Sequence, residues 1–334
     1  MLSMLRLLVV LAACLGTTGA VATRNDSWAR LRPAGSRRAR SLLQTGYQYE
    51  LTIGSPSQLD GVSGILPLPN GLLLVADEFN YRLLFFRDDG SVAGVLGTGT
   101  QGSGPNEFDR PNDAALSPDG EKLFIVDSFN RRVKVYTLDP NENGILDPGE
   151  PALDFIFGSS GASPGQFLLP LGIVTGADGI YVTDYQLSRI TKFNFTGAVV
   201  WFIGQTGTGN GEFRGAVGCA IGRNVQVGPT LVPEVLYVAD NLNNRVQYFD
   251  ASNGAYLGQF GGSGSQPGQL AAPAYIDVTV DGNVVVADTG NHRIQRLDPT
   301  GNPQLAFGTQ GTGPGQFQDA SKAPAERAPC LWLA

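Results

Sequence analysis

The stretch Val238-Ala-Asp-Asn-Leu-Asn-Asn-Arg245 decides how this 334-residue chain folds, because close copies of it recur along the sequence. In each copy an aspartate follows a Val or Ile by two positions, and an arginine follows that aspartate five positions later. The copies occupy residues 75–82, 125–132, 182–189, 238–245 and 286–293. Their aspartates are spaced 50, 57, 56 and 48 residues apart. Internal repeats of this period indicate a fold built from similar units placed side by side.

Glycine-rich loops that end in a large apolar residue alternate with these copies. The loops end at Phe108, Phe167, Phe213, Leu270 and Phe317. Between the two kinds of marker, short apolar or alternating runs are separated by turn pairs such as Asp119-Gly120, Asp178-Gly179 and Asp281-Gly282. No long stretch has helical periodicity. About four short strands in each unit of roughly 50 residues predict the blade of a β-propeller.

The motif Val-x-Asp-x-x-Asn-x-Arg, with its glycine-rich loop, closely resembles the NHL repeat over residues 47–317; Leu187 replaces the asparagine in one copy. NHL domains usually form six-bladed propellers, so the resemblance implies an all-β ring of the six-bladed type. Five complete blades are expected, at roughly residues 55–97, 109–158, 168–204, 214–261 and 271–308. Residues 47–54 read as the outer strand of a sixth blade, but residues 318–334 contain neither a strand pair nor another motif copy. We therefore expect an irregular or incomplete sixth blade.

The remaining segments are expected to lie outside the propeller. Residues 1–22 read as a signal peptide, with a short apolar run and the cleavage pattern Ala20-Val21-Ala22. Residues 23–46 are expected to be a disordered, arginine-rich spacer, and residues 318–334 an irregular tail. The arginines also suit a transit peptide, so an organelle lumen is the alternative to secretion. No later run is long and apolar enough to predict a membrane span.

Charge and cysteine content narrow the expected partners. The chain has 23 basic and 30 acidic residues; residues 1–46 hold seven of the bases and one of the acids, so residues 47–334 carry a net charge of −13. Such a surface repels phosphate backbones, which argues against nucleic-acid binding. Three cysteines are too few for a fold built on disulfides. Whether Cys219 and Cys330 pair stays open, and Cys219 is best interpreted as a small buried apolar residue.

The repeated aspartates and arginines are interpreted as structural. The pairs are Asp77 and Arg82, Asp127 and Arg132, Asp184 and Arg189, Asp240 and Arg245, and Asp288 and Arg293. Their spacing predicts that each pair meets across a hairpin turn. A catalytic site needs unlike residues that converge once, whereas these pairs recur in every blade. Separately, Asn194-Phe-Thr196 is an N-glycosylation sequon at a predicted hairpin tip, and an unmodified surface asparagine is the alternative.

Residues 139–150 fit the calcium-loop pattern D-x-[DN]-x-[DN]-G-x5-E at every fixed position. The expected ligands are Asp139, Asn141, Asn143, the carbonyl of Ile145, Asp147 and Glu150. The loop resembles EF-hand loops, but predicted strands flank it instead of helices. The alternative is a polar insertion in blade two, because turns favour the same residues. Calcium is the expected cofactor, with a dissociation constant on the order of 10⁻⁴ M.

Two functions are compatible with these patterns. The preferred one is a scaffold that binds a protein or a glycan, with calcium as a possible stabiliser. The alternative is a calcium- or metal-dependent hydrolase or lyase with its site at the central channel, which converging carboxylates there would favour. The amidating lyases that resemble this fold need several histidines, whereas His292 is the single histidine here and is interpreted as an exposed turn residue. No residue is assigned a catalytic role.

Overall fold

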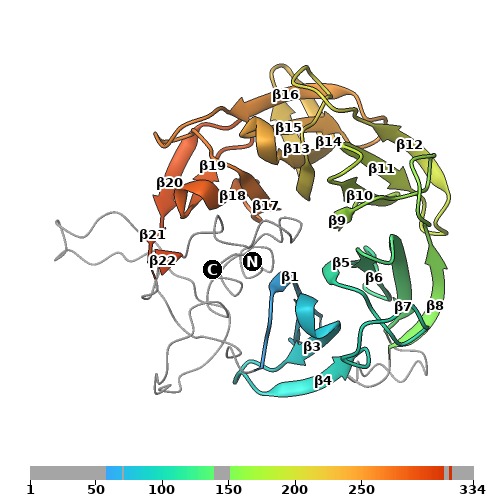
Figure 1. The fold of residues 1–334 in the computed structure, drawn as a ribbon. Coiled ribbons are helices and arrows are strands. Elements are labelled where there is room, and N and C mark those ends of the chain that lie inside the picture. Colours follow the sequence, from blue (N-terminus) through green and yellow to red (C-terminus); the bar gives the residue numbers. More distant parts are fainter. Residues whose placement is uncertain (1–57, 70, 139–150, 312–315, 318–334) are drawn as a thin grey trace.

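In a computed structural model, residues 58–69, 71–138, 151–311 and 316–317 of the protein are described. They form five four-stranded antiparallel sheets that stand as blades around a central axis (Figure 1). The predicted all-β propeller and its five complete blades are therefore confirmed. Residues 47–54 and 318–334, on which the expectation for the sixth blade depends, lie outside the described residues.

Each blade is built from four consecutive strands. Blade one contains β1 (Val62–Pro67), β2 (Leu73–Asp77), β3 (Arg82–Phe86) and β4 (Val92–Leu96). Blade two contains β5 (Pro111–Leu116), β6 (Lys122–Asp127), β7 (Arg132–Thr137) and β8 (Ala152–Phe157). Blade three contains β9 (Pro170–Thr175), β10 (Ile180–Asp184), β11 (Arg189–Phe193) and β12 (Val199–Ile203). In every blade the first strand lies nearest the axis (Figure 1).

The last two blades follow the same order. Blade four contains β13 (Ala216–Val227), β14 (Thr230–Asp240), β15 (Arg245–Asp250) and β16 (Tyr256–Gly261), and blade five contains β17 (Pro273–Val278), β18 (Val284–Asp288), β19 (Arg293–Leu297) and β20 (Pro303–Phe307). The 3₁₀ helices η1 (Glu78–Asn80), η2 (Asn241–Asn243) and η3 (Thr289–Asn291) join second to third strands, and β21 (Thr309–Gln310) pairs with β22 (Gln316–Phe317). No helix in the described part of the chain is long and apolar enough to cross a membrane.

The hydrophobic cores lie between neighbouring blades, because successive side chains of a strand point to opposite faces. On β6, Leu123 and Ile125 pack into a cluster shared with blade one. Phe124 and Val126 of the same strand pack into a cluster that includes Phe193 of blade three. Similar clusters join blade three to blade four and blade four to blade five. Each sheet therefore buries both faces only when it has neighbours.

Glycines let the innermost strands approach one another closely. A methyl group at Gly218 on β13 would lie 2.5 Å from the carbonyl oxygen of Ala274 on β17. Likewise, a methyl group at Gly172 on β9 would lie 2.5 Å from the carbonyl oxygen of Val217 on β13. Distances this short exclude a side chain unless the backbone moves. The narrow part of the ring is thus set by glycine at the third position of these inner strands.

All five turns that carry the repeated motif share one backbone conformation. The residue just before each motif arginine has a left-handed conformation; these residues are Tyr81 (φ 54), Arg131 (φ 54), Ser188 (φ 51), Asn244 (φ 54) and His292 (φ 51). The motif aspartate and arginine then stand opposite each other in the register of the second and third strands, as Asp240 and Arg245 do. We call the side of the ring that carries these turns and the glycine-rich loops the motif face. The opposite side, which carries the tips of the first and third hairpins of each blade, is the insertion face.

Candidate functional site

The motif aspartate is the centre of a buried hydrogen-bond network, which blade four illustrates. Asp240 is fully buried and accepts from the backbone N–H of Arg214 at 2.8 Å and from Nε of Arg245 at 2.7 Å. It also accepts from the amides of Asn243 (2.9 Å) and Gln247 (3.2 Å). A carboxylate with this many donors is satisfied despite its burial. The network connects the residues that precede the inner strand with the turn between the second and third strands.

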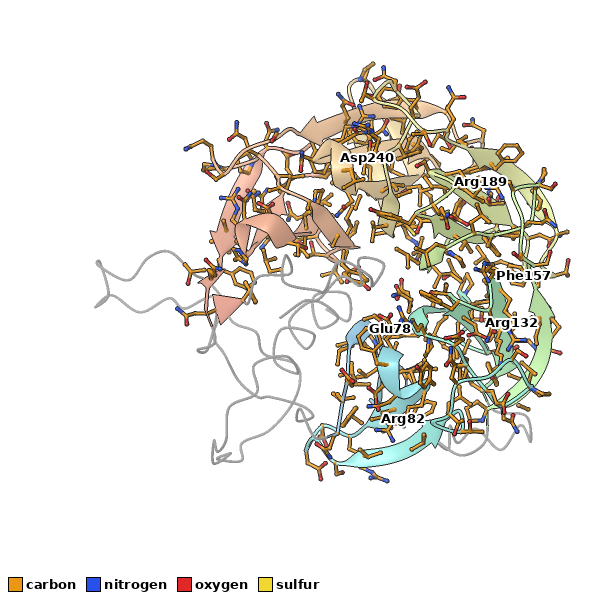
Figure 2. The ribbon with its side chains drawn as sticks, in the orientation of Figure 1. Glu78, Arg82, Arg132, Phe157, Arg189 and Asp240 are labelled. Atoms are coloured by element: carbon orange, nitrogen blue, oxygen red, sulfur yellow. The ribbon has the colours of Figure 1, made fainter. Side chains whose placement is uncertain are left out.

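The motif arginine extends this network into the glycine-rich loop. In blade four, Arg245 donates to the carbonyls of Gly209 and Glu212 at 2.8 and 2.9 Å. Four of the five predicted pairs form ion pairs, at 2.8 Å for Asp77 and Arg82, 2.8 Å for Asp127 and Arg132, 2.7 Å for Asp240 and Arg245, and 2.7 Å for Asp288 and Arg293. Arg82, Arg132 and Asp240 are marked in their blades in Figure 2. The geometry assigns these residues to the architecture of the blade.

Blade three departs from this pattern. Asp184 and Arg189 are paired in the strand register, but no ion pair joins these two described residues. Arg189 donates to the carbonyls of Ala162 (2.7 Å) and Ser163 (3.0 Å), and its guanidinium lies 5.6 Å from the ring centroid of Phe202. Burial lowers the pKa of Arg189, while the nearby Asp184 opposes that effect. Of the five predicted ion pairs, the one between Asp184 and Arg189 is therefore not formed.

The departure has a local cause at the position that lacks asparagine. In the other four blades the asparagine amide donates to the motif aspartate, as Asn243 does to Asp240. In blade three the backbone N–H of Leu187 takes that place, donating to Asp184 at 2.9 Å. The N–H of Leu168 donates to Asp184 Oδ2, the oxygen that accepts from the arginine elsewhere. Asp184 therefore has backbone donors where the other aspartates have side chains.

A buried lysine supports the glycine-rich loop of blade two. The Lys134 ammonium donates to the carbonyls of Gly104, Pro105 and Glu107 at 3.1, 2.8 and 2.6 Å, and lies 4.3 Å from the ring centroid of Phe108. Burial lowers the pKa of Lys134 to about 8. In blades four and five glutamines hold the corresponding position and bond the corresponding loop. Lys134 is therefore a loop anchor.

An arginine stacked between two phenylalanines lies where blades one and two meet on the motif face. The guanidinium carbon of Arg110 is 4.2 Å from the ring centroid of Phe129 and 5.1 Å from that of Phe79. Both phenylalanines stand two positions after a motif aspartate, in Asp77-Glu-Phe79 and Asp127-Ser-Phe129. All three stacked side chains are half-buried, so part of each reaches the surface. We call these three residues the stack.

Three buried polar atoms beside the stack have no hydrogen-bond partner among the described residues. They are Oδ1 of Asp109, Oγ of Ser128 and Nε of Arg131. Each is tied to the stack, because the N–H of Ser128 donates to the carbonyl of Arg110 and the N–H of Phe129 donates to that of Asp109. Nη1 of Arg131 donates to the carbonyl of Phe129 at 3.1 Å. Unpartnered buried polar atoms are rare in native proteins, so this grouping marks the place where a ligand or water is expected.

The inner strands bring further polar groups toward the axis. Asn112 and Asp113 of β5 are nearly buried, and Asp113 Oδ2 accepts from the N–H of Ile173 in blade three at 3.1 Å. The Tyr275 hydroxyl of β17 donates to Asn112 Oδ1 at 3.4 Å. Within the described residues, no three histidine, cysteine, aspartate or glutamate side chains gather in a way that could hold a metal ion. Asn112, Asp113 and Tyr275 are thus engaged in contacts between blades.

Two family models match this chain, one described as a 6-bladed beta-propeller over residues 58–144 and one as an NHL repeat over residues 270–297. The second match spans the motif of blade five, with its buried Asp288. The chain is a β-propeller that contains an NHL repeat, and it is called the NHL propeller below. NHL propellers commonly bind proteins, and at that level the fold supports a scaffold. The resemblance drawn from the repeated motif is confirmed.

The NHL propeller is similar to one curated protein and to solved propellers. It is 30% identical to "Protein SUPPRESSOR OF QUENCHING 1, chloroplastic" of Arabidopsis thaliana over an alignment of 161 residues that covers 44% of this chain and 14% of that protein. It therefore matches a small part of that relative's length. The solved structures include "Crystal structure of Nidogen/Laminin Complex" (15% identity, TM-score 0.52, 74% of this chain and 79% of that chain) and "Streptogramin B lyase structure" (15%, 0.51, 75% and 70%). At this identity the likeness shows the fold alone.

The other predicted site residues of the NHL propeller are placed as follows. The calcium ligands Asp139, Asn141, Asn143, Ile145, Asp147 and Glu150 lie outside the described residues, as does Cys330. Cys219 is buried between blades three and four. His292 takes the left-handed turn position of blade five, as predicted, and is half-buried there where an exposed side chain was predicted.

Sequence reasoning about the NHL propeller missed the stack. Phe79 and Phe129 come from different blades, and only their shared offset from the motif aspartate could have connected them. Arg110 precedes Pro111, a context that normally favours extended backbone, yet its φ is 54°. No pattern in the sequence predicted a left-handed conformation at Arg110. The stack combines aromatic and guanidinium groups, which are enriched at the energetic centres of protein interfaces.

Proposed function

We propose that this protein is a binding scaffold that captures a protein partner on its motif face, at the stack of Phe79, Arg110 and Phe129. One observation carries the proposal: a cation held between two half-buried rings lies among three unpartnered polar atoms. The rings supply apolar contact area, and the polar atoms supply unused hydrogen-bonding capacity. Such a combination suits an interface that becomes dry when the partner binds.

The backbone of Arg110 supports a functional reason for its presence. The residue just before the inner strand also has a positive φ in three other blades, where it is Gly61 (φ 72), Gly215 (φ 77) or Ala272 (φ 46). Glycine adopts this conformation freely, whereas a residue with a side chain loses roughly 1 kcal/mol or more. Blade two carries an arginine here despite that cost. Ala272 shows that the ring tolerates this strain in blade five, and in blade two the residue that bears it is the arginine of the stack.

The donors and charges of the site favour an acidic group on the partner. Nε of Arg131 is a buried donor without an acceptor, and the Ser128 hydroxyl can donate as well. Arg110 and Arg131 place two guanidinium groups at the site, beside the Asp109 carboxylate, on a propeller whose overall charge is negative. A carboxylate from an aspartate, a glutamate or a chain terminus would satisfy these donors. We therefore propose that the partner contributes a carboxylate beside the stack.

Peptide display on the whole protein tests this proposal. A random peptide library is selected on the wild type, and the best peptide is measured by titration calorimetry against variants. We expect selected peptides to contain Asp or Glu, and the Arg110→Ala and Phe129→Ala variants to bind at least tenfold more weakly. Leu242→Ala is the matched control, because Leu242 occupies the position of Phe129 in blade four and is 58% exposed.

Four outcomes would reject parts of this proposal. Peptides without acidic residues would reject the carboxylate, as would full retention of binding when the peptide Asp or Glu is replaced by its amide. Equal binding by the wild type and Arg110→Ala would reject the stack as the binding surface. A larger loss in Leu242→Ala than in Phe129→Ala would move the site to blade four.

We propose further that the protein is secreted and that calcium stabilises blade two. The leader pattern of residues 1–22 supports secretion, and the ligand pattern of residues 139–150 supports calcium. Fluorescent fusion to the full chain tests the location, and accumulation in an organelle lumen would overturn secretion. Calorimetric titration with calcium tests the loop. We expect heat from the wild type and none from Asp139→Ala, and no heat from the wild type would reject the site.

A further inference from the structure

The hairpin tip between β11 and β12 places an asparagine side chain in a fixed position. Asn194 Oδ1 accepts three hydrogen bonds, from the N–H of Thr196 (3.0 Å), the hydroxyl of Thr196 (2.8 Å) and the N–H of Ala198 (2.9 Å). The side-chain oxygen is therefore used to close the turn. Nδ2 of Asn194 makes no hydrogen bond to the part of the chain that the structure describes.

Blade five shows what the turn itself requires. There Asp298 Oδ1 accepts the same three bonds, from the N–H and the hydroxyl of Thr300 and from the N–H of Asn302, each at 2.9 Å. A carboxylate closes the turn as well as an amide does, so folding needs one oxygen and no nitrogen. The second Asp298 oxygen accepts from the Asn302 amide at 2.7 Å. Blade three has Ala198 at the position of Asn302, so Nδ2 of Asn194 is left without that neighbour.

The neighbouring residues keep this tip rigid and accessible. Phe195 points toward the core, where its ring centroid is 6.1 Å from that of Phe124 in blade two. Thr196 and Ala198 are exposed, and Asn194 is half-buried. Residues 194–196 satisfy the Asn-x-Thr sequon, whereas the related turn of blade five has aspartate followed by Pro299. Of these two otherwise matching turns, only the turn of blade three has an asparagine that can accept an N-linked glycan.

We propose that Asn194 carries an N-linked glycan, attached at Nδ2. In the transfer, Nδ2 loses one proton and bonds to the anomeric carbon of a lipid-linked oligosaccharide diphosphate, and the lipid diphosphate leaves with the electron pair of the broken bond. The tip belongs to a connection between third and fourth strands and thus lies on the insertion face. The stack lies on the motif face, so the glycan leaves the proposed partner site uncovered.

The inference rests on entry into a secretory compartment, so its experiment has two arms. The full chain is expressed in a eukaryotic secretory host, once with its own leader and once behind a leader of that host. Asn25→Gln is included in both arms, because Asn25-Asp-Ser27 is also a sequon. Peptide-N-glycosidase treatment and mass spectrometry of the peptide containing Asn194 report the glycan. We expect a glycan in both arms, its loss in Asn194→Asp and Thr196→Ala, and its retention in Thr196→Ser.

Each result bears on a separate claim. Secreted protein without a glycan in the host-leader arm overturns Asn194 as an acceptor. A glycan in the host-leader arm alone establishes the acceptor and overturns the secretory location. Because Asp298 closes the same turn in blade five, Asn194→Asp should keep the melting temperature of unglycosylated wild type. A collapse of that variant's fold would show that Nδ2 has a structural role and would count against the proposal.

Discussion

The Tyr275 hydroxyl of blade five donates a hydrogen bond to Asn112 of blade two, at 3.4 Å and 163 residues apart in sequence. The two blades lie on opposite sides of the axis, so this contact crosses the ring (Figure 1). Contacts between neighbouring blades are local in the ring, whereas this one limits how far opposite blades can separate. It therefore acts as a strut across the centre of the propeller.

Removal of the strut should weaken the propeller slightly. Tyr275→Phe keeps the ring and deletes the hydroxyl, and we expect it to lower the free energy of unfolding by about 1 kcal/mol. Chemical denaturation measures the change. Tyr256→Phe is a control for the loss of a phenol elsewhere in the fold. If Tyr275→Phe were as stable as the wild type, the long 3.4 Å bond would contribute nothing measurable.

Blade three should differ from blade four in a double-mutant cycle. Asp240 and Arg245 are in contact at 2.7 Å and buried, so we expect a coupling energy of about 1.5–3 kcal/mol between alanine substitutions. For Asp184 and Arg189, which form no ion pair with each other, we expect less than about 1 kcal/mol. Urea unfolding of the four variants in each cycle provides both numbers. Equal coupling in the two blades would contradict the difference in geometry.

The buried Lys134 should make stability rise with pH in the alkaline range. Burial lowers its pKa from 10.5 to about 8 in the folded protein. Below pH 8 both states hold the proton, and the buried charge is fully unfavourable. Between pH 8 and 10.5 the unfolded chain retains a proton that the folded chain has released, so the free energy of unfolding increases, by at most about 1.4 kcal/mol per pH unit.

The glutamine found at the same position in blades four and five provides the control. Lys134→Gln should remove this alkaline increase, because the amide does not titrate. Denaturation of both proteins at several pH values between 7 and 10 measures the difference between their slopes. Parallel slopes would mean that the three carbonyls around the ammonium keep the lysine charged over this range.

A side chain larger than hydrogen at Gly218, between the inner strands of blades four and five, should destabilise the propeller. Gly218→Ala places a methyl group 2.5 Å from the Ala274 carbonyl oxygen, and the obstacle is backbone. We expect a loss of about 2–4 kcal/mol in the free energy of unfolding, because blades four and five must move apart. Gly228→Ala, at the open tip of the β13–β14 hairpin, tests whether a methyl group alone matters, although its φ of 56° adds some strain. Similar losses in both variants would contradict the crowding argument.

The fold was predictable because its information is local and repeated. An aspartate and an arginine five residues apart specify one hairpin register, and continuous apolar runs such as Leu123-Phe-Ile-Val126 specify which strands are buried on both faces. The stack was not predictable in this way. It depends on a positive φ at Arg110 and on two rings 50 residues apart, and neither follows from local preference. The exchange of partners at Arg189 depends on backbone donors whose positions only the folded turn defines.

The five motif turns hold one backbone shape with five different occupants, Tyr81, Arg131, Ser188, Asn244 and His292. Because the buried aspartate networks define the turn, the occupant contributes little to the choice of fold. Point mutations at these positions can therefore change the chemistry of one whole side of the disc without disturbing its assembly. Such a ring offers natural selection, or a protein engineer, five equivalent positions at which single substitutions can create new binding specificities.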